Sequence, residues 1–252
     1  MSLSSKYNLG FISDSDILSH VVNTVKNYRT SIDLKKFNQN IIDPIKLTFD
    51  AKVYNKDIET VVADECFRQI DKSNSNIIGY FHQNIFKYAG DEWQVPTKGY
   101  DLINSERHIY AEIKNKHNTM NSSSSQKTYM KMQNTILQDD EATCYLVEVI
   151  SALPGDRAWQ ISLNGTPISH KNIRKISVDA FYGIVFNDPH AFYKLCTKLP
   201  EIIGDAVAIT QSISLHNSVF DELSELDPNI QKSLFLLAFS QYEGFSNVSK
   251  DR

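Results

Sequence analysis

Two short runs decide the fold of this chain, GYDLI at residues 99–103 and IYAEIK at residues 109–114. Both contain the aromatic and β-branched residues that favour strands, and the second alternates its side chains between two faces. A short polar turn at residues 105–107 joins them, so we expect an antiparallel hairpin. This hairpin would be the first strand pair of a sheet.

Three charged side chains on the hairpin indicate a chemistry. Glu112 and Lys114 are two residues apart and therefore share one face of their strand. Asp101 can lie opposite Glu112, where Cβ atoms are about 5 Å apart. Two facing carboxylates repel each other, and a bound Mg²⁺, which prefers oxygen ligands, would remove that repulsion. With Lys114 placed to orient or activate a water, the spacing fits a magnesium-dependent nuclease.

The alternative is a solvent-facing hairpin that merely alternates in charge. The spacing alone does not separate the two interpretations. The context favours the nuclease, because both acids have apolar neighbours, and a polar helix and then an apolar strand at residues 142–151 follow the hairpin.

Length and composition indicate an ordinary globular protein. The chain has 252 residues, 41% of them hydrophobic and 22% charged, so we expect a single domain over residues 1–252. The three cysteines are far apart in the sequence, which suggests neither a disulfide framework nor a zinc site. No signal sequence or run of eighteen apolar residues is present, so we expect a cytoplasmic protein with no membrane partner.

The charge is unevenly distributed along the chain. The net charge is −4, which argues against a nonspecific polycation but not against local DNA binding. Residues 106–131 contain five basic and two acidic side chains, whereas residues 201–252 contain three basic and eight acidic ones. We therefore expect DNA near the hairpin, and dimer contacts or additional DNA contacts in the part from 166 to 252, with dimerisation or packing favoured by its acidity.

The order of expected elements defines the fold class. A polar run at 72–76 is typical of a turn, and residues 45–49 fit either a strand or a helix. Helices are expected at residues 14–29, 57–71, 77–88, 126–138, 189–199 and 219–239, and strands at 100–104, 108–114, 142–151, 159–163, 174–178 and 182–186. This order predicts an α/β fold with a central mixed β-sheet flanked by helices.

The run from 115 to 131 begins directly after Lys114 and is rich in hydroxyl, amide and basic side chains. Such groups suit phosphate oxygens, and Asn and Gln can read base edges. A flexible serine-rich loop is the alternative. The residues predicted to contact DNA are Lys116, His117, Asn118, Asn121, Ser123, Ser124, Gln126, Lys127, Tyr129 and Lys131.

These residues together resemble the type II restriction endonucleases of the PD-(D/E)xK superfamily. Asp101, Glu112 and Lys114 match the motif, although Tyr100 stands where the motif usually has proline. The segments at 71–84 and 114–131 look like the family that cuts GGNCC and GGWCC sites, and the resemblance covers roughly residues 40–165.

The resemblance implies a restriction-endonuclease-like core at about residues 55–165. It implies that Asp101 and Glu112 bind Mg²⁺ together with the carbonyl of Ile113 and a phosphate oxygen. Members of the superfamily often add an acid from a helix before the sheet, and Glu65 is the best candidate for this further catalytic and metal-binding residue. The alternative for Glu65 is an ion pair with Arg68 or Lys72.

The function expected from the resemblance is Mg²⁺-dependent cleavage of double-stranded DNA at a short palindromic site. A two-fold symmetric site favours a homodimer. A cognate DNA methyltransferase would be a functional but not a physical partner. The alternatives are a repair or junction-resolving nuclease of the same fold and a non-catalytic DNA-binding module.

Overall fold

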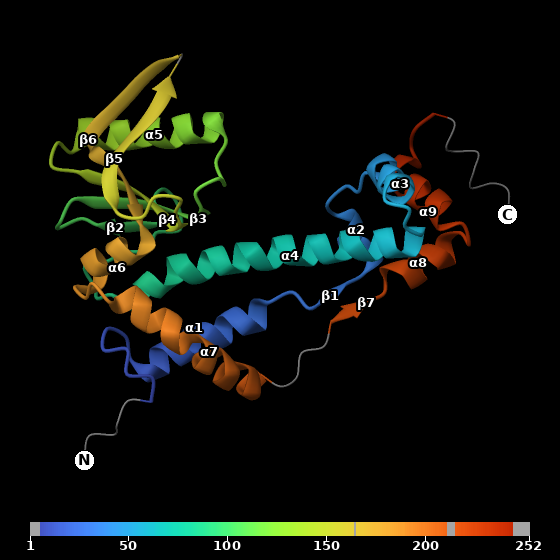
Figure 1. Ribbon diagram of the computed structural model, residues 1–252, viewed down its shortest axis with the longest axis horizontal. Helices are drawn as coiled ribbons and strands as arrows, with labels where there is room; N and C mark the ends of the chain where they lie inside the picture. Colours follow the sequence, from blue (N-terminus) through green and yellow to red (C-terminus); the bar gives the residue numbers. More distant parts are fainter. Residues whose placement is uncertain (1–5, 164, 211–214, 244–252) are drawn as a thin grey trace. The chain divides into compact units, whose positions relative to one another are not determined.

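The computed structural model describes residues 6–163, 165–210 and 215–243, which form two compact units (Figure 1). Unit 1 comprises Met1–Asn27 and Ile77–Gln211, and unit 2 comprises Tyr28–Asn76 and Ser212–Arg252. The single domain expected over residues 1–252 is not tested by this division and stays a prediction. Buried residues on both sides of the segment Ile77–Gln211 share a separate hydrophobic core in unit 2.

Unit 1 is built on a mixed sheet of five strands, counted over the residues that the structure describes. The outer pairs β2/β3 and β5/β6 are antiparallel, and the inner pairs β3/β4 and β4/β6 are parallel. In their order across the sheet the strands are β2 (Leu102–Asn104), β3 (Ile109–Lys116), β4 (Thr143–Ile150), β6 (Thr166–Ser177) and β5 (Asp156–Leu163). The predicted α/β fold with a central mixed sheet is confirmed.

Helices cover both faces of this sheet (Figure 1). One face carries α5 (Ser122–Gln138), whose Tyr129 and Met132 are buried against the sheet. The other face carries the remaining helices of unit 1. These are α1 (Asp14–Asn27), the last part of α4 (Ile58–Asn84), the short 3₁₀ helix η1 (Ile85–Tyr88), α6 (Val178–Phe186) and α7 (Ala191–Thr210).

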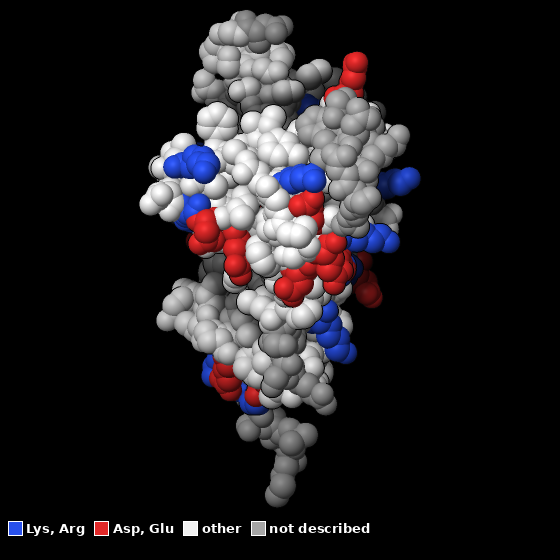
Figure 2. Space-filling model, turned by 90° about the vertical axis from the view of Figure 1, so that its right-hand side faces the viewer, with Lys and Arg blue, Asp and Glu red and all other residues white. Residues whose placement is uncertain are grey.

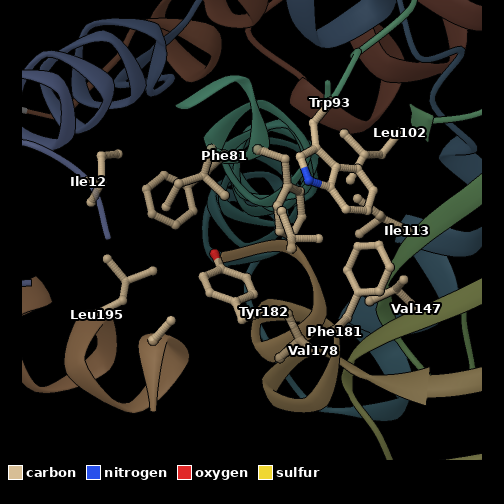
Figure 3. Close-up of a cluster of buried hydrophobic side chains, with 14 of the residues drawn as sticks. Ile12, Phe81, Trp93, Leu102, Ile113, Val147, Val178, Phe181, Tyr182 and Leu195 are labelled. Carbon is tan, nitrogen blue, oxygen red and sulfur yellow. The ribbon is translucent and has the colours of Figure 1, made fainter. Parts of the chain in front are cut away.

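The main core of unit 1 combines aliphatic side chains with a group of aromatic ones (Figure 3). Phe181 of α6 packs near Trp93 and against Ile113 and Val147 of the sheet, and Tyr182 follows on the same helix. Because Ile113 faces this core, the alternation of side chains places its neighbours in β3 on the opposite face, beneath α5. The buried positions of β3 thereby fix the face on which its charged residues lie.

Unit 2 is a small helical unit with its own core. Leu47, Val62, Cys66, Leu223 and Leu234 are buried together there. A short parallel pair joins β1 (Ser31–Ile32) to β7 (His216–Asn217). The helices of unit 2, besides the first part of α4, are α2 (Leu34–Asn38), α3 (Pro44–Val53), α8 (Val219–Leu226) and α9 (Ile230–Phe239).

Figure 2 shows one face of the molecule, on which acidic side chains gather among lysines and arginines. A face of mixed sign does not attract a phosphate backbone in the way a basic face does.

Several expected boundaries are wrong, each for a local reason. The expected turn at 72–76 is helical within α4, because the run contains neither glycine nor proline and Asn74 bonds the backbone of Arg29. The expected strand at 182–186 belongs to α6, since a short apolar run does not distinguish strand from helix. The expected helix at 219–239 is two helices separated at Pro228. The ambiguous residues 45–49 lie in α3.

Cys66 and Cys144 are free and buried, and Cys196 is free and exposed. Across the described part of the chain, no helix is both long and apolar enough to span a membrane.

Candidate active site

The β2–β3 hairpin places Asp101 beside Glu112. Leu102 pairs with Ala111 in the antiparallel register, and the backbone N–H of Asp101 donates to the carbonyl of Ala111 at 2.9 Å. The Asp101 carboxylate in turn accepts a hydrogen bond from the backbone N–H of Ile113, 2.7 Å from Oδ2. Asp101 is thus bound to β3 on both sides of the position that carries Glu112.

Lys114 completes the cluster that the spacing predicts. Its Nζ lies 3.2 Å from Oε2 of Glu112 and 3.8 Å from Oδ2 of Asp101. Only 12% of the Glu112 side chain and 29% of the Lys114 side chain are exposed, so the charges interact with limited screening by water. The three groups meet at one partly buried place beneath α5.

The surroundings of Asp101 disfavour its negative charge. Burial raises the pKa of Asp101 above its ordinary value, and the charge of Glu112 raises it further. The N–H of Ile113 and the charges of Lys114 and Lys131 act in the opposite direction without cancelling the rise. A carboxylate whose negative charge is disfavoured in this way gains stability from a nearby cation.

The donor set fits a hard divalent ion that keeps part of its water shell. Within the described ranges, no group of three or more His, Cys, Asp and Glu side chains is arranged to hold a metal ion. Two carboxylates and a backbone carbonyl would therefore leave several positions for water and phosphate. Mg²⁺ is commonly bound in this way, through one or two carboxylates together with waters and substrate phosphate oxygens.

Lys131 is a member of the cluster that the sequence does not predict. It is expected to contact DNA, but its Nζ forms an ion pair with Oε1 of Glu112 and donates to the carbonyl of Gly99 at 2.8 Å. It also lies 3.9 Å from the centre of the Tyr100 ring. The only sequence signal is a lysine close to the buried positions Tyr129 and Met132 of α5, and that signal does not identify the partner.

Glu65 lies in unit 2 and already has two donors. Arg68 donates from Nε to its Oε2 at 2.6 Å, and Gln69 donates from Nε2 to its Oε1 at 3.0 Å. Burial acts to raise the pKa of Glu65, but these hydrogen bonds together with the positive charges of Arg68 and Lys46 lower it below its ordinary value. This geometry favours the ion-pair alternative with Arg68, and a metal-binding role for Glu65 stays a prediction.

The other predicted DNA contacts lie at the end of β3 and along α5. Asn121 caps α5 by accepting from the N–H of Ser124 at 2.8 Å, so the serine run is helical rather than irregular. Gln126 donates from Nε2 to the carbonyl of Ser162 at 2.8 Å. Tyr129 is fully buried against Trp159, which does not fit a DNA contact. The exposed residues of the set are Lys116, His117, Asn118, Asn121, Ser123, Ser124 and Lys127.

A second buried carboxylate lies one strand away. Glu148 of β4 is 2% exposed and pairs in register with Lys114. It accepts hydrogen bonds from Lys175 and Ser151, both at 2.7 Å. Burial acts to raise its pKa, while these two bonds lower it below the ordinary value. A glutamate within the apolar run 142–151 is the sequence signal that could have marked it.

The fold and the cluster define the class of this protein. A mixed sheet whose first hairpin carries two facing carboxylates and a lysine is a restriction-endonuclease-like PD-(D/E)xK core, as the motif predicts. The sequence matches the Eco47II restriction endonuclease family over residues 9–208, and the chain therefore belongs to that family.

Two relatives agree with this membership. The chain is 29% identical over 215 residues to the type II restriction enzyme Sau96I of Staphylococcus aureus, a match that covers 81% of this chain and 82% of the relative. It is also 29% identical over 208 residues to the type II restriction enzyme Eco47II of Escherichia coli. This match covers 77% of this chain and 86% of the relative. The predicted type II restriction endonuclease is confirmed at the level of the family.

Proposed function

We propose that this chain cuts both strands of DNA at a short palindromic site, GGNCC or GGWCC, with Mg²⁺ as cofactor. The observation that carries the proposal is the meeting of Asp101, Glu112 and Lys114 on one hairpin. The site sequence rests on the likeness of residues 71–84 and 114–131 to the enzymes that cut these sites.

The residues that would hold the ion are Asp101, Glu112 and the carbonyl of Ile113. When bound, the ion would supply stabilisation of the charge that develops on the phosphate oxygens and the leaving group. Asp101 is kept in place by the N–H of Ile113. This hydrogen bond fixes one carboxylate oxygen and leaves the other for the cation.

Lys114 acts on the attacking water. Its ammonium lies between the two carboxylates, at 3.2 and 3.8 Å, and is therefore held beside the place where the cation and phosphate would meet. From there Lys114 orients the water or, once it has lost its own proton, accepts one from the water. The exposed side chains that follow, Lys116 to Asn118 and Lys127, lie beyond this lysine and would contact the DNA backbone.

The symmetry of the proposed site favours a homodimer, in which each copy meets an equivalent half-site. Sedimentation equilibrium of the free protein would show a dimer if this is right. A cognate methyltransferase that protects the same site would act on DNA without binding this chain. A cytoplasmic location is where the protein would meet both DNA and the methyltransferase, and it stays a prediction.

One digest tests the proposed function against its alternatives. The full chain is incubated with plasmid DNA in Mg²⁺, with and without EDTA. We expect discrete bands that end at GGNCC or GGWCC sites in Mg²⁺, and none in EDTA. Cleavage only of branched DNA would favour a junction-resolving nuclease, and binding without a product would favour a non-catalytic module.

A further inference from the structure

Two lysines from different elements bind the carboxylate of Glu112. Lys114 approaches Oε2 from the same strand at 3.2 Å, and Lys131 contacts Oε1 from α5. Each oxygen of this carboxylate thus has its own ammonium partner. The PD-(D/E)xK motif accounts for Lys114, whereas it does not contain Lys131.

Lys131 has two further contacts besides Glu112. Its Nζ donates to the carbonyl of Gly99 at 2.8 Å and lies 3.9 Å from the centre of the Tyr100 ring. The Tyr100 hydroxyl is itself hydrogen-bonded to Oγ1 of Thr135, one turn further along α5, at 2.7 Å. A cation over an aromatic face is attracted by the ring, and more strongly where water is excluded. Tyr100, the residue that replaces the proline of the motif, therefore supports this lysine.

The charges at the site balance without a metal ion. Asp101 and Glu112 carry two negative charges, and Lys114 and Lys131 carry two positive ones. A divalent ion that binds Glu112 has to compete with the ammonium groups already there. Lys131 is the group suited to leave, because it comes from a separate helix and has a flexible four-carbon stem. An ammonium released there is a suitable donor to a phosphate oxygen.

We propose that Lys131 is a second active-site lysine, which neutralises Glu112 in the metal-free enzyme and moves to a phosphate oxygen of the DNA when a divalent ion takes the carboxylate. This inference rests on the proposed metal site at Asp101 and Glu112. It differs from a purely structural role because it predicts that Lys131 opposes metal binding.

The test is the affinity for Ca²⁺ without DNA, measured by titration calorimetry on the full chain. Lys131→Met keeps an unbranched stem over Tyr100 but removes the charge. We expect it to bind Ca²⁺ about 3-fold more tightly or better, while its cleavage rate at saturating Mg²⁺ falls about 10-fold or more. Lys131→Arg keeps the charge and should bind Ca²⁺ with near wild-type affinity.

A matched control is available on α7. Lys198 also pairs with a glutamate, Glu201, at 3.0 Å, but at the surface and outside the cluster. Lys198→Met should leave both Ca²⁺ affinity and cleavage unchanged. If Lys131→Met binds Ca²⁺ no more tightly than wild type, or cleaves at the wild-type rate in saturating Mg²⁺, the role proposed for Lys131 is wrong.

The variant Glu112→Gln distinguishes a wrong role for Lys131 from a wrong metal site. If the metal site is right, Glu112→Gln binds Ca²⁺ far more weakly than wild type, whatever Lys131→Met does. If Glu112→Gln binds Ca²⁺ as wild type does, the proposed metal site is wrong and the inference about Lys131 falls with it. Thermal unfolding of each variant confirms that the affinities refer to folded protein.

Discussion

The carboxylate of Asp101 is joined to the backbone of Ile113 by a hydrogen bond of 2.7 Å, which ties the residue just before β2 to the middle of β3. The N–H that donates this bond belongs to the residue between Glu112 and Lys114. The geometry of the site therefore depends on the hairpin register, and a shift of one residue would move Asp101 away from Glu112 and Lys114, which share β3.

Asp101→Asn tests the metal-binding role with little change of shape. The amide would keep an oxygen to accept from Ile113, but it would lose the charge that attracts a cation. We expect cleavage in Mg²⁺ to fall at least about 100-fold, while specific DNA binding in Ca²⁺ remains measurable by gel shift. Cleavage within a few-fold of wild type would mean that Asp101 has no role in holding the ion.

Asn121 has a structural role that can be separated from its predicted DNA contact. Its side chain caps α5, so Asn121→Ala should lower the free energy of unfolding by about 1 kcal/mol, whereas Asn121→Ser should preserve it. Urea denaturation measures both. If both variants also weaken DNA binding equally, the amide contacts DNA as well. An unchanged stability of Asn121→Ala would contradict the cap.

Glu148 and Lys175 form a buried pair whose two halves depend on each other. Lys175→Met leaves the Glu148 carboxylate, which is 2% exposed, without its main cationic partner. We expect a loss of about 1–3 kcal/mol of stability. The double variant Glu148→Leu with Lys175→Met should recover most of this loss, because an apolar pair of similar volume replaces the ion pair. Additive losses in a double-mutant cycle would contradict the coupling.

The pair His108 and Asp139 predicts a pH dependence of stability. The hydrogen bond from His108 to Asp139, 2.8 Å, raises the pKa of His108 above its ordinary value of 6.5. The folded state therefore holds this proton more tightly than the unfolded chain. The contribution is fully present below about pH 6.5 and is lost as the pH rises through the raised pKa.

His108→Asn is the matched variant, because asparagine tolerates the positive φ of 51° at this position. Urea denaturation at about pH 5.5 and about pH 8.5 brackets the titration. The loss of stability between the two should be smaller in His108→Asn than in wild type. Equal losses would assign the pH dependence to other groups.

The hairpin and its three charged residues could be predicted because they depend on local information. A period of two places Glu112 and Lys114 on one face, and a short turn brings Asp101 alongside. The ion pair of Lys131 with Glu112 depends on how α5 packs on the sheet, and the sequence of the helix does not predict that packing. The same limit applies to unit 2. Hydrophobic periodicity indicates which face of a helix is buried, but not which other helix it packs against. The sequence therefore could not predict that Val62 and Leu223 share one core.

The polar segment at 72–76 shows a different limit. Serine and asparagine favour turns because their side chains can hydrogen-bond to the nearby backbone, but tertiary contacts can override that preference. The side chain of Asn74 bonds both the N–H and the carbonyl of Arg29, a partner distant in the sequence. The helix therefore continues through residues that looked like its end.

The variant Lys114→Ala tests the proposed active site most directly. We would measure the single-turnover rate at which Lys114→Ala cleaves a duplex with one GGNCC site in saturating Mg²⁺, with binding of the same duplex in Ca²⁺ as the control. We expect a rate at least about 100-fold below wild type, with specific binding retained. Cleavage at the wild-type rate would contradict the site formed by Asp101, Glu112 and Lys114.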